Sequence, residues 1–248
     1  MEYERREQQG HKQEVTRMTA EHTWIVQNDL GPVGVYITRR LTALSAGHHP
    51  KVIVAPRHPE VSPIDFLKAE EPTAIILGGS LSSAVEPEPW MDWEYDLIRE
   101  AVRTSVPLLG LCFGHQAIAS AMGGKVERRQ MQRGPKVIVP EGESILFRGV
   151  TDWRFVGTHE DHVTQLPPGF RRIATSDYCA IQGIQHASSP VFGVQFHPCY
   201  DGAAAQVKEL GLTDQEAYAN GDGVRLVRNF LAFASQRATG KAHQMATS

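Results

Sequence analysis

The segment VPLLGLCFGHQAIASAMGG, residues 106–124, carries the most informative pattern in the chain. An apolar run leads to Cys112, glycines flank the cysteine two residues away on either side, and small and apolar residues follow up to a pair of glycines. This pattern predicts a buried strand over 106–112, a sharp turn at the cysteine, and a helix over 115–124 that the glycine pair ends.

Three more apolar runs precede this stretch, and none shows the alternation of a half-exposed strand. Strands are predicted over 22–29, 51–58 and 72–80, with amphipathic helices over 34–47 and 89–105. Strands that are apolar throughout and alternate with helices are typical of a parallel sheet covered on both faces. The sequence therefore predicts an α/β fold with a mostly parallel central sheet flanked by helices.

The second half of the chain has a different pattern. Short strand-like segments separated by turn residues predict a smaller antiparallel β patch on the same domain, and they cover 124–130, 135–143, 154–166, 171–177, 179–187 and 191–198. A helix is predicted over 203–211, a loop over 220–223 and a last apolar helix over 223–236.

Neither a repeat nor a long linker divides the chain, so residues 21–236 are predicted to form a single domain. Residues 1–20 are charged and lack an apolar segment, so they are expected to be a disordered extension and not a secretion signal. Residues 237–248 are expected to fray.

Composition excludes several classes of protein. The 248 residues carry a net charge of −3, which gives no indication of a nucleic-acid or membrane surface. No apolar run approaches the roughly 20 residues that span a bilayer. Three cysteines are too few for a disulfide framework and favour a reducing compartment, so a cytoplasmic protein is expected.

Cys112 is a candidate nucleophile. Residues 110–114 fit the pattern Gly-x-nucleophile-x-Gly, in which a strand turns sharply into a helix and larger side chains would clash. The amides and the positive dipole end of that helix are expected to lower the pKa of the thiol. The alternative is a buried structural cysteine, which is the more common role of a lone cysteine.

A thiol nucleophile needs a base, and His197 is the best candidate. It ends the apolar segment VFGVQFHP, residues 191–198, where a proline then stops the strand. A buried strand of this kind can deliver its terminal histidine to the sheet edge at which the turn opens. The alternative is a histidine that merely ends a strand.

Four co-linear segments together resemble the class I glutamine amidotransferase family. They are AIILGGS (74–80), LLGLCFGHQAIASAMGGKV (108–126), GTHEDHVTQLPPGF (157–170) and VFGVQFHP (191–198). The resemblance extends over most of the chain, from about residue 23 to about residue 200. It implies a flavodoxin-like fold, a Cys-His-Glu triad and no cofactor.

The resemblance implies a role for each matching residue. Cys112 would attack the side-chain amide of glutamine to form a γ-glutamyl thioester, and His197 would take the thiol proton and deliver one to the leaving ammonia. The backbone N–H groups of Gly79 and Phe113 would form the oxyanion hole. Substrate-binding roles fall on Gly78 and Gln116 and on the matching loop of Thr158, His159, Glu160 and Asp161.

Part of the same loop has a second interpretation. His159, Asp161 and His162 carry side chains that can bind metals, but their spacing matches no standard metal site. No metal is therefore expected.

The chain departs from the family at Cys199, where the family has the glutamate of its His-Pro-Glu motif. A cysteine cannot replace the carboxylate that orients the imidazole. Three interpretations stay open: a Cys112–His197 dyad, orientation of the imidazole by another group such as Glu160, or loss of the glutaminase. A disulfide between Cys112 and Cys199 is not expected.

The segment 200–223 is longer than expected for the family, and it could cap the site, form a partner surface or be a tolerated insertion. No ammonia-accepting domain is evident, so the resemblance implies that the partner is a separate synthase chain. The alternatives are a self-contained γ-glutamyl amide or peptide hydrolase and a catalytically impaired protein with a binding or regulatory role.

Overall fold

The computed structural model describes residues 22–57, 60–214, 216 and 221–246. The predicted N-terminal extension, residues 1–20, lies outside the described residues.

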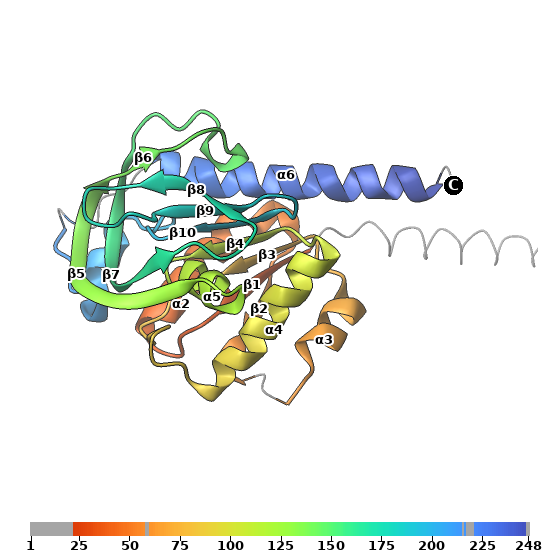
Figure 1. Cartoon of the computed structure of the whole chain (residues 1–248), viewed down its shortest axis with the longest axis horizontal. Helices are drawn as coiled ribbons and strands as arrows, with labels where there is room; N and C mark the ends of the chain where they lie inside the picture. Colours follow the sequence, from red (N-terminus) through yellow and green to blue (C-terminus); the bar gives the residue numbers. More distant parts are fainter. Residues whose placement is uncertain (1–21, 58–59, 215, 217–220, 247–248) are drawn as a thin grey trace, which may run out of the picture.

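An eight-stranded sheet forms the centre of the molecule, in the order β2-β1-β3-β4-β10-β9-β8-β6 (Figure 1). Its strands are β1 (Thr23–Gln27), β2 (Lys51–Val54), β3 (Ala74–Leu77), β4 (Leu108–Leu111), β6 (Val139–Pro140), β8 (Phe170–Thr175), β9 (Gly183–His186) and β10 (Val191–Val194). The first five strands in this order pair in parallel, and the last three join antiparallel. The predicted α/β fold with a mostly parallel sheet is confirmed.

The smaller antiparallel patch is also present. Strands β5 (Lys125–Val137) and β7 (Arg154–Gln165) form a separate two-stranded sheet at one side of the main sheet (Figure 1). The expectation of separate strands over 124–130 and 135–143 is wrong, because β5 runs through Gly134 and Pro135 as one strand. Its pairing with β7 shifts register between Arg128 and Gln132, and so tolerates the irregular stretch.

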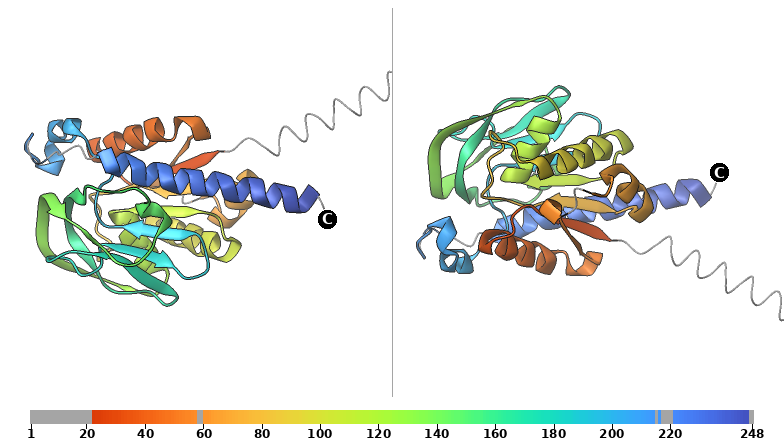
Figure 2. Two further views of the ribbon diagram at one scale, coloured as in Figure 1. Left: turned by 90° about the horizontal axis from the view of Figure 1, so that it is seen from above. Right: turned by 90° about the horizontal axis from the view of Figure 1, so that it is seen from below.

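Helices cover both faces of the central sheet (Figure 2). Helices α2 (Pro32–Leu44) and α6 (Gly221–Ala246) lie on one face, and α3 (Pro63–Glu70), α4 (Pro89–Thr104) and α5 (Phe113–Ala121) lie on the other. The side chains of β1 show why its strand is apolar throughout. Ile25 packs into the cluster under α2 and α6, whereas Trp24 and Val26 pack into the cluster under α4 and α5.

Two helix predictions near the C-terminus need correction. The helix expected over 203–211 is two 3-10 helices, η4 (Gly202–Gln206) and η5 (Lys208–Leu210), because Val207 between them is extended. Helix α6 begins inside the expected loop over 220–223, where the Asp222 carboxylate accepts hydrogen bonds from the amides of the 151–152 turn. It continues to Ala246, so residues expected to fray are helical.

Segment 200–223 is in part a component of the core. Its residues Ala204, Leu210 and Leu212 are buried in the cluster that includes α2 and α6. Sequence patterning also missed α3, whose eight residues begin with Ser62 as cap and Pro63 at the first helical position.

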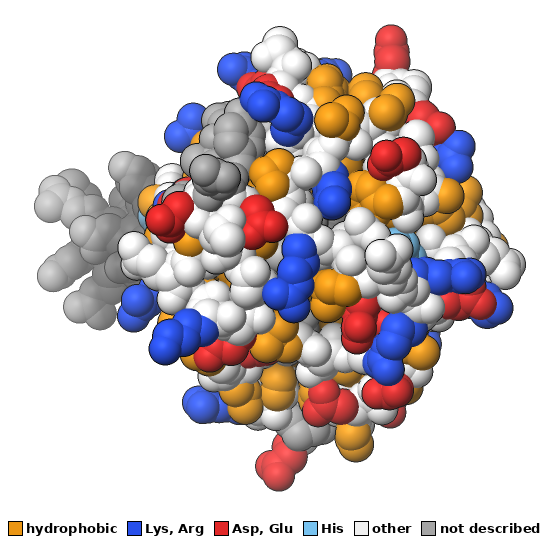
Figure 3. Space-filling model, turned by 90° about the vertical axis from the view of Figure 1, so that its left-hand side faces the viewer, with side chains coloured by type: hydrophobic (Ala, Val, Ile, Leu, Met, Phe, Trp, Pro, Cys, Tyr) orange, Lys and Arg blue, Asp and Glu red, His pale blue; other side chains and the backbone are white. Residues whose placement is uncertain are grey.

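No helix among the described residues is long and apolar enough to cross a membrane. On the face that carries β5 and β7, acidic and basic side chains are interspersed, with apolar side chains between them (Figure 3). Neither sign of charge dominates that face.

Candidate active site

Cys112 lies at the turn between β4 and α5, as the sequence predicts. Its φ is 51°, a value that is uncommon for a residue with a side chain. Its N–H donates to the carbonyl of Val194 at 2.9 Å, and its carbonyl accepts from the first turn of α5. A Cβ on Gly110 would overlap the carbonyl of Gly114, and one on Gly114 would lie 2.7 Å from Leu77 Cβ. The two glycines are therefore needed for the turn to close.

Gly79 adjoins both candidate catalytic side chains. A Cβ placed on it would be 3.1 Å from His197 Cε1 and 3.8 Å from Cys112 Cβ. These distances show that the structure brings Cys112, His197 and the segment that follows β3 together. Only a glycine fits there without displacing the imidazole.

The burial of Cys112 corrects the expectation about its pKa. Burial raises the pKa of the thiol to about 12, although the Phe113 N–H acts in the opposite direction. The side chain is 4% exposed, so loss of hydration outweighs the helix terminus. In this closed site the thiol is protonated, contrary to the thiolate that the turn pattern favours.

His197 is held from its backbone and by one aromatic ring. Its N–H donates to the carbonyl of Val156 in β7 at 2.9 Å. Its imidazole stacks on Tyr200, with ring centroids 4.0 Å apart and an interplanar angle of 15°. Neither ring nitrogen has a hydrogen-bond partner within the described part of the chain. Burial lowers the pKa of His197 to about 3, so the imidazole is neutral.

Cys199 does not orient this imidazole. It is 1% exposed and belongs to the apolar cluster that includes Ile37 and Phe196. Burial raises the pKa of its thiol to about 12, so it carries no charge for the histidine. All three cysteines are free.

Glu160, the other group considered as an orienter, also fails to reach His197. Its carboxylate is half-exposed and lies 3.4 Å from the guanidinium of Arg128. The interpretation that Glu160 orients the histidine is therefore wrong for this structure.

The four residues expected in a substrate-binding loop lie within strand β7. The Asp161 carboxylate accepts from the Ser83 hydroxyl at 2.6 Å and from the Ala84 N–H at 3.1 Å, and so anchors the segment that follows Gly79. His159 Nδ1 lies 3.2 Å from the Asp161 carbonyl, and Thr158 Oγ1 lies 3.4 Å from the Tyr200 hydroxyl.

A chain of amides connects Gln116 to Cys112. Gln116 Nε2 donates to the Asp161 carbonyl at 2.7 Å and to Gln195 Oε1 at 3.3 Å. Gln195 Nε2 in turn donates to Cys112 Sγ at 3.7 Å. Sequence reasoning missed Gln195, although it stands two residues before His197 in an otherwise apolar segment. A polar residue in such a segment is the signal that could have identified it.

A second missed group holds the Gly78 carbonyl. That oxygen accepts from the Gly114 N–H at 3.2 Å and from Asn28 Nδ2 at 3.0 Å. Asn28 also donates to the fully buried Glu94 at 3.1 Å, and burial raises the pKa of this glutamate to about 8. The Gly78 carbonyl and the Gly79 N–H share one trans peptide, so these bonds fix the direction of that N–H.

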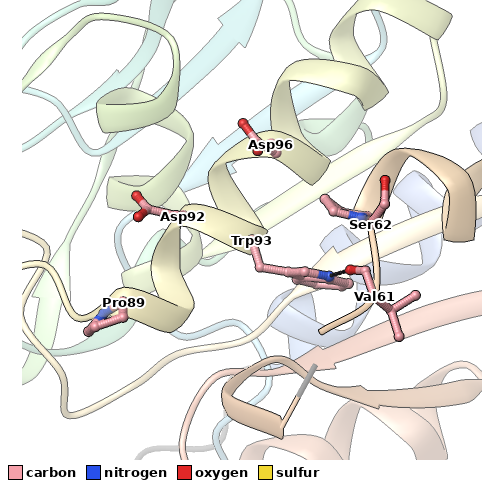
Figure 4. Close-up of a pocket in the computed structure, with 7 residues that line it drawn as sticks. Val61, Ser62, Pro89, Asp92, Trp93 and Asp96 are labelled. Carbon is pink, nitrogen blue, oxygen red and sulfur yellow. Dashed lines mark hydrogen bonds between the residues drawn. The ribbon is translucent and has the colours of Figure 1, made fainter. Parts of the chain in front are cut away.

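One surface hollow lies apart from the candidate catalytic residues. Across the described residues, no three or more His, Cys, Asp and Glu side chains are arranged to hold a metal ion. One shallow hollow lies at the starts of α3 and α4, where the Trp93 indole donates to the Val61 carbonyl at 2.7 Å (Figure 4). None of the candidate catalytic residues lines it.

The fold and the turn at Cys112 together define a flavodoxin-like α/β protein with a sharp strand-to-helix turn at the carboxyl end of a central parallel strand. The family follows from comparison with known sequences. Residues 36–206 match the model of the family "Glutamine amidotransferase class-I", and the chain belongs to this family.

Among its relatives is a glutamine-hydrolyzing GMP synthase subunit of Methanosarcina mazei. It is 40% identical over 149 residues, which are 56% of this chain and 71% of that protein. The corresponding protein of Thermococcus kodakarensis is 36% identical over 143 residues, 56% of this chain and 73% of that protein.

Solved structures agree on the fold. A glutamine amidotransferase from Thermotoga maritima superposes with a TM-score of 0.71 at 19% identity, covering 87% of this chain and 98% of that one. A second glutamine amidotransferase, from Methylobacillus flagellatus, gives a TM-score of 0.63 at 23% identity, covering 88% of this chain and 91% of that one.

Proposed function

We propose that this chain hydrolyses the side-chain amide of glutamine with Cys112 as nucleophile and His197 as base. The observation that carries the proposal is the position of Gly79. A Cβ on Gly79 would lie 3.1 Å from His197 Cε1 and 3.8 Å from Cys112 Cβ, so both candidate catalytic side chains adjoin this one backbone position. A substrate amide that enters beside Gly79 would meet the sulfur, the base and a backbone donor together.

The first step forms the γ-glutamyl thioester. The sulfur of Cys112 bonds to the amide carbon, the thiol proton passes to His197, and the imidazolium then protonates the departing nitrogen, which leaves as ammonia. Water next attacks the thioester with His197 again as base, and glutamate leaves as the thiol is restored. The sum is glutamine plus water giving glutamate plus ammonia.

The protonation states of the Cys112 thiol and the His197 imidazole support this order of events. A thiol with its pKa near 12 and an imidazole with its pKa near 3 are both neutral before substrate binds. Proton transfer therefore accompanies attack, instead of preceding it as in a preformed ion pair. Without a carboxylate at position 199, the machinery is a Cys-His dyad.

Backbone amides would stabilise the oxyanion. The Phe113 N–H begins α5 directly after Cys112 and acts to lower the pKa of its thiol. The Gly79 N–H is fixed by the bonds to the Gly78 carbonyl on the same peptide. Preorganised donors of this kind are typically worth about 10²–10³ in rate each.

Residues of β7 and α5 would bind the amino-acid end of glutamine. His159 Nε2 is buried and has no hydrogen-bond partner among the described residues, so it is available to a polar substrate group. Gln116 Nε2 donates to the backbone carbonyl of Asp161 and so adjoins the same part of β7. Thr158 and Glu160 are the neighbours of His159 in strand β7.

The ammonia would pass to a separate synthase chain. The relatives from Methanosarcina mazei and Thermococcus kodakarensis are each named as one subunit of a GMP synthase. This chain is accordingly proposed to work with a second chain, and its hydrolysis of glutamine should be slow alone and faster with that partner and its acceptor.

Mass spectrometry after treatment with a diazo-ketone analogue of glutamine tests the nucleophile. Labelling is expected at Cys112 alone, with the buried Cys179 and Cys199 as internal controls. No labelling of Cys112 would contradict the proposal. Turnover of γ-glutamyl amides or peptides without any partner would instead indicate a self-contained hydrolase.

A further inference from the structure

The ring of Tyr200 is the one group in the described residues that faces the His197 imidazole at stacking distance. The two ring planes are 15° apart and the centroids 4.0 Å apart. Tyr200 is 4% exposed, and burial raises the pKa of its phenol well above the ordinary value, so its ring stays neutral.

The Tyr200 ring is itself held from two sides. Its hydroxyl lies 3.4 Å from Thr158 Oγ1 on β7. Its edge meets the ring of Tyr36 on α2, with centroids 5.6 Å apart in a T-shaped arrangement. A ring fixed by two separate elements presents a constant surface to the imidazole.

The backbone around Tyr200 is fixed by α2. The Tyr36 hydroxyl donates to the Asp201 carboxylate at 3.0 Å and accepts from the Asp201 N–H at 3.1 Å. Arg40 pairs with the same carboxylate at 3.0 Å and donates to the Cys199 carbonyl at 3.3 Å. Both residues that flank Tyr200 are therefore anchored, and the stack does not depend on a mobile loop.

No other group takes the place of the missing carboxylate. Cys199 is neutral in the apolar cluster, Glu160 pairs with Arg128, and neither imidazole nitrogen has a partner in the described part of the chain. The orientation of the ring therefore rests on its backbone bond to Val156, on the bare face of Gly79 and on Tyr200.

We propose that Tyr200 is the positioning residue that replaces the third member of the triad. The stack fixes the plane of the imidazole, and the π-face of the phenol attracts the imidazolium that forms when the thiol proton is transferred. This inference rests on the proposed function, because it needs His197 to act as the base. The attraction of a cation to a desolvated aromatic face is typically worth about 2 kcal/mol.

Variants of Tyr200 test the inference through the steady-state kinetics of glutamine hydrolysis. Tyr200→Leu removes the π-face and should lower kcat by about 30-fold, with KM changed by less than about twofold. Tyr200→Phe keeps the face, loses only the contact with Thr158, and should retain most of kcat. Should the leucine variant fail to fold, Tyr200→Met removes the ring with a flexible side chain of similar length and should show the same loss.

Phe230→Leu is the matched control. Phe230 is a fully buried ring on α6 that packs against Phe192, and in the described part of the chain it makes no ring contact with His197 or Tyr200. The Phe230→Leu variant should lower the midpoint of thermal unfolding, as Tyr200→Leu does. Its kcat should stay within about twofold of the wild-type value.

The experiments distinguish failure of the Tyr200 inference from failure of the proposed function. If the wild type is labelled at Cys112 and hydrolyses glutamine, but Tyr200→Leu or Tyr200→Met keeps the wild-type kcat, the inference is overturned alone. Equal losses in the phenylalanine and leucine variants would also overturn it, because the hydroxyl would then be the group that matters. A wild type that leaves Cys112 unlabelled overturns the proposed function and this inference together.

Discussion

The two halves of the candidate site are built in different ways. Around Cys112 the geometry comes from backbone: a positive φ, flanking glycines and a peptide carbonyl held by Asn28 and Gly114. Around His197 the geometry comes from side chains, chiefly the stacked Tyr200 and the residues of α2 that anchor its neighbours.

This difference explains how one half can vary while the other cannot. A Cβ would collide with backbone at Gly110 and Gly114, and at Gly79 it would force the imidazole or Ile37 to shift, so these positions are restricted to glycine. An imidazole can be held by any group that fixes its plane, and a carboxylate at position 199 is only one such group. The absence of that carboxylate therefore does not require that the nucleophile has lost its base.

Removing the nucleophile should have the largest effect. Cys112→Ala is expected to lower kcat for glutamine hydrolysis by about 10⁴-fold or more, since no other group can form the thioester. The matched variant Cys179→Ala removes a thiol of similar burial that bonds to the Ile181 carbonyl. Glutamate release should persist in the second variant; its loss in both would show that the effect is structural.

Adding one methyl group at Gly79 tests the contact between the halves. The new Cβ would lie 3.1 Å from His197 Cε1 and 3.0 Å from Ile37 Cδ1, so the imidazole must move. Gly79→Ala should lower kcat by about 100-fold, because a small displacement of a catalytic group is costly. At Gly47 a Cβ would meet nothing within 4 Å, so Gly47→Ala is the control. Unchanged turnover of Gly79→Ala would mean that the two halves do not act together.

Changing one amide to a carboxylate tests the backbone half. Asn28→Asp keeps the shape of the side chain but removes the donor to the Gly78 carbonyl. We expect kcat to fall by about tenfold with little change in KM, since the oxyanion donor loses its fixed direction. Asn229 likewise donates to two carbonyls, of Leu146 and Arg148, far along the chain from the site. Asn229→Asp should lower the unfolding midpoint and leave kcat unchanged; parallel losses of kcat would argue against a positioning role for Asn28.

Restoring the family's carboxylate should have the smallest effect on rate. Cys199→Glu is expected to raise kcat by about threefold, because the stack already sets the ring plane and only the charge is added. It should also lower the free energy of unfolding by about 1–3 kcal/mol, since position 199 is 1% exposed. Cys199→Gln, of equal length and neutral, should destabilise without the gain. A gain of about 100-fold would show that Tyr200 contributes little to holding the imidazole.

Local sequence patterns predicted much of the architecture. The runs 22–29, 51–58, 72–80 and 106–112 each contain a strand of the parallel sheet, because a strand covered on both faces must be apolar at every position. Patterns failed where local and tertiary preferences differ. Residues 203–211 have helical composition, yet an extended Val207 divides them, and their apolar side chains are buried against α2 and α6.

The candidate site also has one part that local sequence predicts and another that it does not. The turn at Cys112 follows from sequence alone, because glycines two residues away on either side permit one sharp strand-to-helix turn. Gln195 could be singled out as a polar residue in an apolar segment, but its partner Cys112 is 83 positions away and could not be predicted. The partners of Asn28, at Gly78 and Glu94, are 50 and 66 positions away and leave no local pattern.

The family, the strands of the parallel sheet and the turn at Cys112 can be predicted from the chain alone, because each depends on residues that are close together in the sequence. The protonation of the candidate reacting groups and the support of the imidazole depend on how the folded chain packs. Burial, which sets the pKa of Cys112 near 12 and that of His197 near 3, is a property of the packed molecule. So is the stack of Tyr200 on His197, which needs α2 and β7 to hold the phenol in place.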